Sequence, residues 1–407
     1  MALLLLSTLS RREPLLASFV KRFQSPRIIT KSRRLGCVGF VKEKSYQASQ
    51  VSENDLFSHI HPSKLASKEK YSLAGVRYLA GSNDKGFPKF LGVPRKDLPH
   101  ALQVEHADKF SISEWAQNCR HLLDNELSKY GAILFRGLPL SKGEQFSVFT
   151  NAIGYSPMGY EGGAVDRPVF DKKAFTFVST SENKDLNIEP HSDMAYSAVY
   201  PNKIIFYCDM APAPGCRGLT PISSNIEILQ KLDTKVVQKF EEKQVRYMRT
   251  LPSGEGYLPW QVTFGTDNRK KVEKYLETNG FYYEWNKDDD SLFYWLTLPP
   301  TKYHPITGEK VWFNQIESHH SSYFKSSPMM KGMHFESDTQ CPLHTSYGDG
   351  KEIEPEVIQH IRKISWECTV GFPWRNGDVL VLDNVKCRHS RLSFTGERRI
   401  LVFMSPE

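Results

Sequence analysis

The chain has 407 residues, of which 40% are hydrophobic and 12% aromatic, which is ample material for a folded core. Its formal net charge of +7 is confined to one end, because residues 1–50 carry ten Lys and Arg against two Glu, and residues 51–407 carry 43 basic and 44 acidic side chains. A neutral folded part gives no support to nucleic-acid binding, and no apolar run reaches the roughly 20 residues of a membrane span.

Residues 1–50 have the composition of an organelle targeting peptide. They are rich in Ser and Arg, nearly free of acidic side chains, and carry apolar residues at helical spacing, namely Leu15, Leu16, Phe19, Val20 and Phe23. A secretory signal would place its charges before the apolar run, whereas "ALLLLSTLS" comes first here. We therefore expect a targeting peptide for a mitochondrion first and a plastid second. The alternative is a disordered basic tail on a cytoplasmic protein.

The pattern of polar and apolar residues changes near Phe87. Residues 51–87 are polar and mixed with no sustained period, which predicts a linker or an extension, and we expect the folded domain over residues 88–407. Within it, "SISEWAQNCRHLLDNELSKYG" begins with a capping box between Ser111 and Glu114, is apolar on one face and ends before Gly131, which predicts a helix. The next segment, "AILFRGL", predicts a buried strand.

Three further strands are predicted by short β-rich runs with turn residues at their ends: "NKIIFYCDM" (202–210), "GDVLVLDN" (377–384) and "RRILVFM" (398–404). Helices are predicted over 224–243, 268–279 and 354–366, where apolar residues recur at intervals of three and four. Strands at both ends with helices between them do not give the regular alternation of a parallel sheet. The expected fold is mainly β with helical insertions (α+β), an antiparallel sandwich or jelly-roll.

Three His-x-acid triplets occur, where about one or two are expected by chance from 13 His and 46 acidic residues. Two His and one carboxylate on one octahedral face are the ligand set of non-haem Fe(II) oxygenases, and residues two apart on a strand point to the same side. The triplets are His106-Ala-Asp108, His191-Ser-Asp193 and His334-Phe-Glu336.

The context of each triplet favours His191. It precedes a strand, whereas His106 lies between a Pro-rich stretch and a helix cap. His334 lacks a period of two but remains a rival, because it is close in sequence to His389. His389 is the candidate third ligand, since it lies on the link between the strands at 377–384 and 398–404, which we expect to be adjacent and antiparallel.

Several motifs occur in an order that resembles the TauD/TfdA family of Fe(II)/2-oxoglutarate-dependent dioxygenases, in its clavaminate synthase-like and SyrP-like branch. They are "HSDMAY", "PNKIIFYCDMAPAPG", "GLTPIS", "HPITGEKVWFNQ", "SYGDG" and "WRNGDVLVLDNVKCRHSRLSFTGERRILVFM". The resemblance covers Phe87 to the C-terminus. It implies a double-stranded β-helix (jelly-roll) core, with His191, Asp193 and His389 as the iron ligands.

The resemblance also implies that Thr220 and Arg399 hold the far carboxylate of 2-oxoglutarate. An arginine suits this role, because its permanent charge and two-pronged donor match a carboxylate. Strand alternation sends Arg398 and Arg399 to opposite faces, so only one can point inward, and the sequence leaves open which one does; the resemblance chooses Arg399. Two departures from the family pattern are Asp193, where the branch often has Glu, and "CRGLTP" around Thr220.

The implied function is an oxidoreductase that uses Fe(II), 2-oxoglutarate and O2 to oxidise a small molecule by hydroxylation, desaturation or oxidative cyclisation. By analogy the substrate is amino-acid-like or carboxylate-bearing, in specialised metabolism. Arg391, Arg246 and Arg249 are candidate clamps for an acidic substrate. His304, His319, His320 and His344 read first as surface or structural residues, with one lining the pocket as the alternative. The competing function is a non-catalytic binding protein that keeps the dioxygenase fold.

The basic segment leads to a prediction about the mature protein. If it is a targeting peptide, residues up to about 35–50 are removed after import. Mass spectrometry of the protein isolated from its native cells should then find an N-terminus in this range, in an organelle fraction. An intact Met1 on a cytosolic pool would contradict the expectation.

Overall fold

The computed structural model describes residues 53–407, and the expected targeting segment 1–50 lies outside the described residues. None of the described helices is both long and apolar enough to span a bilayer. The α-helices are α1 (Glu53–Leu56), α2 (Pro62–Leu65), α3 (Ile112–Tyr130), α4 (Gly143–Ile153), α5 (Asn225–Lys231), α6 (Thr234–Lys243), α7 (Trp260–Phe264), α8 (Arg269–Thr278), α9 (Ile316–His319), α10 (Ser321–Lys325) and α11 (Pro355–Glu367).

The strands of the described residues form one eight-stranded sheet, two four-stranded sheets and a two-stranded hairpin. Neighbouring strands are antiparallel except for β2 and β3, which are parallel. The eight-stranded sheet runs in the order β1 (Phe57–His59), β2 (His100–Val104), β3 (Ala132–Arg136), β16 (Val379–Asp383), β7 (Lys203–Met210), β18 (Arg399–Ser405), β5 (Thr176–Val178) and β4 (Val169–Asp171). A four-stranded sheet runs β15 (Thr369–Val370), β8 (Ile222–Ser224), β17 (Cys387–Arg391) and β6 (Ile188–His191). The third runs β10 (Tyr282–Trp285), β11 (Leu292–Leu298), β9 (Val245–Leu251) and β14 (Leu343–Tyr347), and β12 (Lys302–Tyr303) pairs with β13 (Lys310–Val311).

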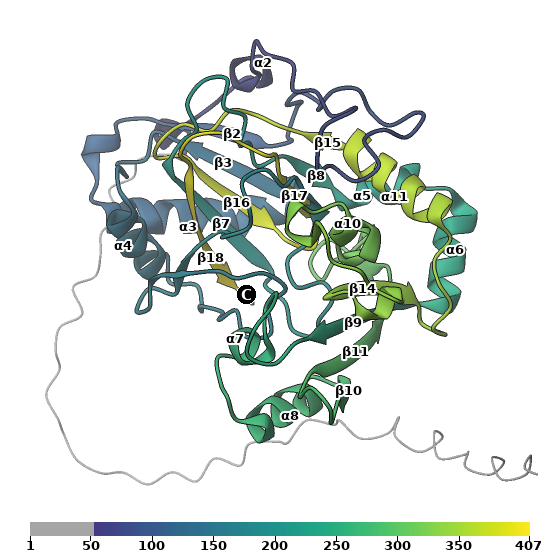
Figure 1. Cartoon of the computed structure of the whole chain (residues 1–407). Coiled ribbons are helices and arrows are strands. Elements are labelled where there is room, and N and C mark those ends of the chain that lie inside the picture. The colour runs from purple at the N-terminus through teal and green to yellow at the C-terminus, as the bar shows by residue number, and fades with distance from the viewer. Residues whose placement is uncertain (1–52) are drawn as a thin grey trace, which may run out of the picture. The chain divides into compact units, whose positions relative to one another are not determined.

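The large sheet has a different core on each face, because successive residues of its central strands alternate in direction. Ile205 and Tyr207 of β7 face the side covered by α3 and α4 (Figure 1), where Trp115 packs against them in one cluster. Ile204 and Phe206 face the other side and share a cluster with residues of β8 and β17. The large sheet and the β15–β8–β17–β6 sheet therefore enclose a common apolar layer. Of the expected mainly β fold with helical insertions, the structure shows mixed sheets with helices.

The predicted helix after Ser111 is confirmed in detail. The Ser111 hydroxyl accepts the backbone N–H of Glu114 and the Glu114 carboxylate accepts that of Ser111, at 3.3 and 2.8 Å, and Gly131 ends α3 at a φ of 76°. The helix expected over 224–243 is instead two helices, α5 and α6. The break falls at Leu232, which is extended, and Asp233 caps α6 by accepting the N–H of Lys235.

The described part of residues 51–87, for which the sequence predicts a linker or an extension, packs against the domain. β1 pairs with β2 at the edge of the large sheet. Leu73, Leu79 and Phe87 are buried in a cluster with Trp366 of α11. The low density of apolar residues hid this packing, because scattered single side chains can anchor a segment without giving it a period.

We predict that Phe57→Ala lowers the free energy of unfolding by about 3–5 kcal/mol, as for a large aromatic side chain removed from a core. Phe57 is 7% exposed, and its ring centroid lies 5.8 Å from that of Trp115 and 5.5 Å from that of Phe135. Phe90→Ala is the control, because Phe90 is 50% exposed. Urea denaturation that found equal losses would show that residues 53–87 do not belong to the core.

Candidate metal centre

Two neighbouring strands and a turn bring His191, Asp193 and His389 together. His191 ends β6, and His389 lies directly opposite it on β17. Asp193 lies in the turn after β6, and this turn is fixed because Asn384 accepts the backbone N–H of Asp193 at 2.8 Å and donates to its carbonyl at 2.9 Å. His389 therefore lies on a strand of the smaller sheet. The expected adjacency of the strands on either side of it was wrong, because β7 separates β16 from β18 in the large sheet.

The three side chains have the geometry of a ligand set. Their ligand atoms all lie within 4.8 Å of one another. Nε2 of His191 is 3.6 Å from one carboxylate oxygen of Asp193, and Nε2 of His389 is 3.9 Å from the other. The Nδ1–H of His191 can donate to the carbonyl of Glu189 at 2.8 Å, which leaves the Nε2 lone pair directed at the group.

The charges at this group suit metal binding. Burial acts to raise the pKa of Asp193, but Arg167, then His191 and His389, outweigh it and hold this pKa well below its usual range. Burial, and then His191, lower the pKa of His389 to about 3, so its imidazole is neutral at physiological pH. A carboxylate beside a neutral imidazole is the state that a cation requires of its ligands. Two imidazoles and one carboxylate fit Fe(II).

Arg167, which no sequence pattern selects, contacts both oxygens of Asp193 at 2.9 and 3.0 Å and stacks on Tyr160. It comes from a loop 26 residues before Asp193, and no motif surrounds it. Only the folded arrangement could identify it.

Within residues 53–407, neither His106 nor His334 belongs to a group of three potential ligands. Two other groups do occur there, and the sequence did not predict them: His59, Asp97 and His100, and His320, His344 and Glu352. In the second group His344 already uses both ring nitrogens, with Glu352 at 2.8 Å and the N–H of Ser321 at 3.4 Å. Of the three triplets, the one at His191 is the one that joins a third potential ligand in the described residues.

A cavity opens beside the three ligands and also contains Thr220 and Arg398. Arg398 donates to the carbonyl of Gly218 at 2.7 Å and to Oγ1 of Thr220 at 2.9 Å, and Trp374 donates to the same oxygen at 3.0 Å. The Thr220 hydroxyl proton therefore remains available to another acceptor.

The structure places Arg399, the expected partner of 2-oxoglutarate, outside this cavity. Its side chain is 50% exposed and pairs with Asp209. Strand alternation does separate the two arginines as expected, but the inward residue is Arg398, so this assignment is corrected. The physical reason is the alternation of side chains along a strand. Ile400 and Val402 of β18 face the second sheet, and Arg398, two residues before Ile400, lies on the same face.

The candidate clamps for an acidic substrate also differ in whether they line the cavity. Arg391 lines the cavity, and its guanidinium donates to the carbonyls of Glu182 and Leu186, each at 2.9 Å. Arg246 donates to the carbonyl of Gly348 and does not line the cavity. Arg249 does not line the cavity, but its charge acts on the lining residues Tyr196 and His319. Among the four unassigned histidines only His319 lines the cavity; His304 instead pairs with Asp383.

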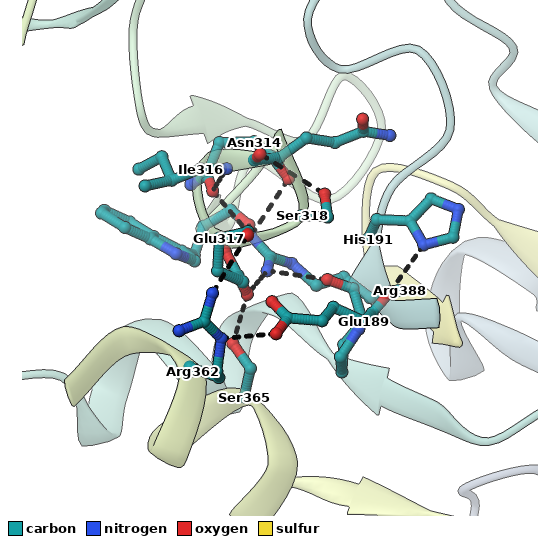
Figure 2. Close-up of polar contacts among 12 residues, drawn as sticks. Glu189, His191, Asn314, Ile316, Glu317, Ser318, Arg362, Ser365 and Arg388 are labelled. Atoms are coloured by element: carbon teal, nitrogen blue, oxygen red, sulfur yellow. Dashed lines mark hydrogen bonds and ion pairs between the residues drawn. The ribbon is translucent and has the colours of Figure 1, made fainter. Parts of the chain in front are cut away.

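A buried network of charges fixes the strands that carry the two histidines (Figure 2). Arg362 of α11 pairs with Glu189 of β6, and Arg388 of β17 pairs with Glu317 of α9. All four side chains are fully buried. Arg388 also donates to Asn314 Oδ1 at 2.8 Å and to Asn225 Oδ1 at 2.9 Å, and Ser365 donates to Glu317 at 2.7 Å.

Comparison with known proteins finds one family model and two similar proteins. The model of the family described as Taurine catabolism dioxygenase TauD, TfdA family matches residues 94–404. The chain is 32% identical to the dapdiamide synthesis protein DdaC of Enterobacter agglomerans, over 75% of this chain and 90% of that protein. It is 29% identical to a clavaminate synthase-like protein of Arabidopsis thaliana, over 78% of this chain and 93% of that one.

The network yields a prediction for stability. Glu317→Ala should lower the free energy of unfolding by about 3–5 kcal/mol, because Arg388 would remain buried without its carboxylate. Glu352→Ala is the matched control, since Glu352 also pairs with a buried side chain but is itself 57% exposed, and the loss should stay below about 1 kcal/mol. Urea unfolding of both variants measures the difference, and similar losses would contradict the network's role.

Proposed function

The chain belongs to the TauD/TfdA family of Fe(II)- and 2-oxoglutarate-dependent dioxygenases, and from this premise we propose that His191, Asp193 and His389 hold the iron. Thr220 and Arg398 would hold the far carboxylate of 2-oxoglutarate. The observation that carries this assignment is one cavity that contains three convergent ligands and a buried arginine. The non-catalytic alternative loses its support, because neither a ligand nor the arginine is missing.

Bound iron would couple the oxidative decarboxylation of 2-oxoglutarate, to succinate and carbon dioxide, with oxidation of the second substrate by O2. The protein's own side chains would orient the metal ligands and balance their charges. Glu189 would fix the ring of His191 through its carbonyl, at 2.8 Å from Nδ1. Asp193 has two oxygens, so one can coordinate while Arg167 keeps the other. This keeps the buried carboxylate ionised and pointed at the metal.

Arg398 suits an anionic cosubstrate because no acidic side chain among the described residues neutralises its charge. Its partners are a carbonyl and a hydroxyl, and no carboxylate lies within ion-pair distance in residues 53–407. Burial, and then Arg391, lower the pKa of Arg398, which means that its charge is held at a cost. A carboxylate would remove that cost, and Thr220 would add a hydrogen bond.

The arrangement of strands supports a double-stranded β-helix. The central strands β3, β16, β7, β18 and β5 pack against β15, β8 and β17 of the smaller sheet through a shared apolar layer. In this interpretation the candidate metal centre lies at the mouth between the two sheets, with its histidines on the smaller one.

The substrate is an amino-acid-like or other carboxylate-bearing small molecule in this proposal. Arg391 and Glu182 support it, because both line the cavity and the charge of Arg391 acts on the Glu182 carboxylate. The name of DdaC, a dapdiamide synthesis protein, supports a role in specialised metabolism. Anaerobic incubation with Fe(II), 2-oxoglutarate and a metabolite extract, followed by O2 and mass spectrometry, should identify a compound that gains oxygen or loses two hydrogens as succinate forms.

The two neighbouring arginines give a direct test. Arg398→Ala should raise the dissociation constant of 2-oxoglutarate by at least a hundredfold, because a lost partner of a buried charge costs about 3–5 kcal/mol and about 1.4 kcal/mol is tenfold. Arg399→Ala is the control and should change it little. Calorimetric titration of 2-oxoglutarate into the anaerobic Co(II)-loaded protein measures both. A large loss in Arg399→Ala alone would overturn the assignment to Arg398.

A further inference from the structure

Two cavity side chains are buried without a hydrogen-bond partner. Neither ring nitrogen of His319 has a partner, and the hydroxyl of Tyr196 has none. Both residues line the cavity beside the metal ligands, and they are only 2% and 4% exposed. Buried polar groups are normally hydrogen-bonded, so two unpartnered ones facing the same cavity indicate a ligand.

His319 and Tyr196 lie together although they come from distant segments. His319 is the last residue of α9, and Tyr196 lies in the turn that follows Asp193. Their ring centroids are 4.5 Å apart, at an interplanar angle of 35°. Glu317 of the same short helix enters the buried network on the other side (Figure 2), and this contact fixes the direction in which α9 presents His319.

The charge behind these two rings favours a negative ligand. Arg249 of β9 is 3% exposed, and it donates to the carbonyls of Gly162 and Gly163 and to the hydroxyl of Tyr294. No carboxylate lies within ion-pair distance of it in the described part of the chain. An unneutralised buried cation creates a positive potential that attracts an anion.

Both rings can act as donors at physiological pH. Burial, then Arg249 and His191, lower the pKa of His319 well below its ordinary value, so the ring is neutral and carries one N–H. Burial, and then Tyr160, raise the pKa of Tyr196 well above its ordinary value, so the phenol keeps its proton. An N–H and an O–H then meet an acceptor in a positive field.

We propose that His319 and Tyr196 form a subsite for a side-chain carboxylate of the substrate, in the field of Arg249. The inference rests on the proposed function, since it concerns the second substrate in the same cavity. It makes the substrate an acid that extends from the metal centre toward α9. His319 and Tyr196 are binding residues in this account, and Arg249 acts through its charge.

The test uses the full chain under anaerobic conditions with Co(II) and saturating 2-oxoglutarate. Three acids are titrated by calorimetry alongside their side-chain amides: L-aspartate and L-asparagine, L-glutamate and L-glutamine, and L-2-aminoadipate and its amide. Each pair differs in charge but hardly in shape, so the difference reports a site for an anion. The variants are His319→Leu and Tyr196→Phe. His320→Leu is the control, because His320 is also buried but faces His344 and does not line the cavity.

We expect at least one acid to bind about tenfold or more tightly than its amide, because hydrogen bonds to a charged group are about twice as strong. His319→Leu and Tyr196→Phe should each reduce the affinity for that acid about tenfold and diminish its preference over the amide, whereas His320→Leu should not. If no acid binds more tightly than its amide, or if the preference survives in both variants, the subsite is wrong. Failure of Co(II) or 2-oxoglutarate to bind would refute the proposed function instead.

Discussion

The pairing of four buried charges is the constraint on which the site depends. Arg388 and Glu189 come from β17 and β6, the strands that carry His389 and His191, and each is paired with a residue of a surrounding helix. A fully buried charge is tolerated only with its partner in place, so these pairs admit few alternative positions for the strands. The positions of His191 and His389 are therefore fixed together with their strands. The network also fixes the position of α9 through Glu317, and His319, the last residue of α9, lines the cavity.

The arginines of the core fall into two classes by their partners. Arg136, Arg362 and Arg388 each meet a buried carboxylate and make a structural contact. Arg398 and Arg249 meet only carbonyls and hydroxyls, and both lie at or behind the cavity. A structure that buries a cation without its own acid leaves that charge for an anion from outside. By this reasoning we propose that the cosubstrate and the substrate place their acidic groups near these two arginines.

The sequence predicted local features well and long-range ones less well. The capping box of α3 follows from a pattern within a short segment, and the structure also brings together the three proposed ligands, which a family resemblance selected. Strand alternation separated Arg398 from Arg399 but could not say which face turned inward, because this depends on the sheet that packs opposite. The position of His389 on β17 and the contact between Arg167 and Asp193 depend on pairing between distant segments, for which a single sequence holds no local signal.

The central claim is that one cavity holds iron on His191, Asp193 and His389 and 2-oxoglutarate on Arg398 and Thr220. Anomalous diffraction at the iron edge, from crystals grown anaerobically with Fe(II) and 2-oxoglutarate, tests it most directly. The account predicts a single strong iron peak among the three side chains, with density for the far carboxylate at Arg398 and Thr220. A peak at His320 and His344, or a carboxylate at Arg399, would contradict it.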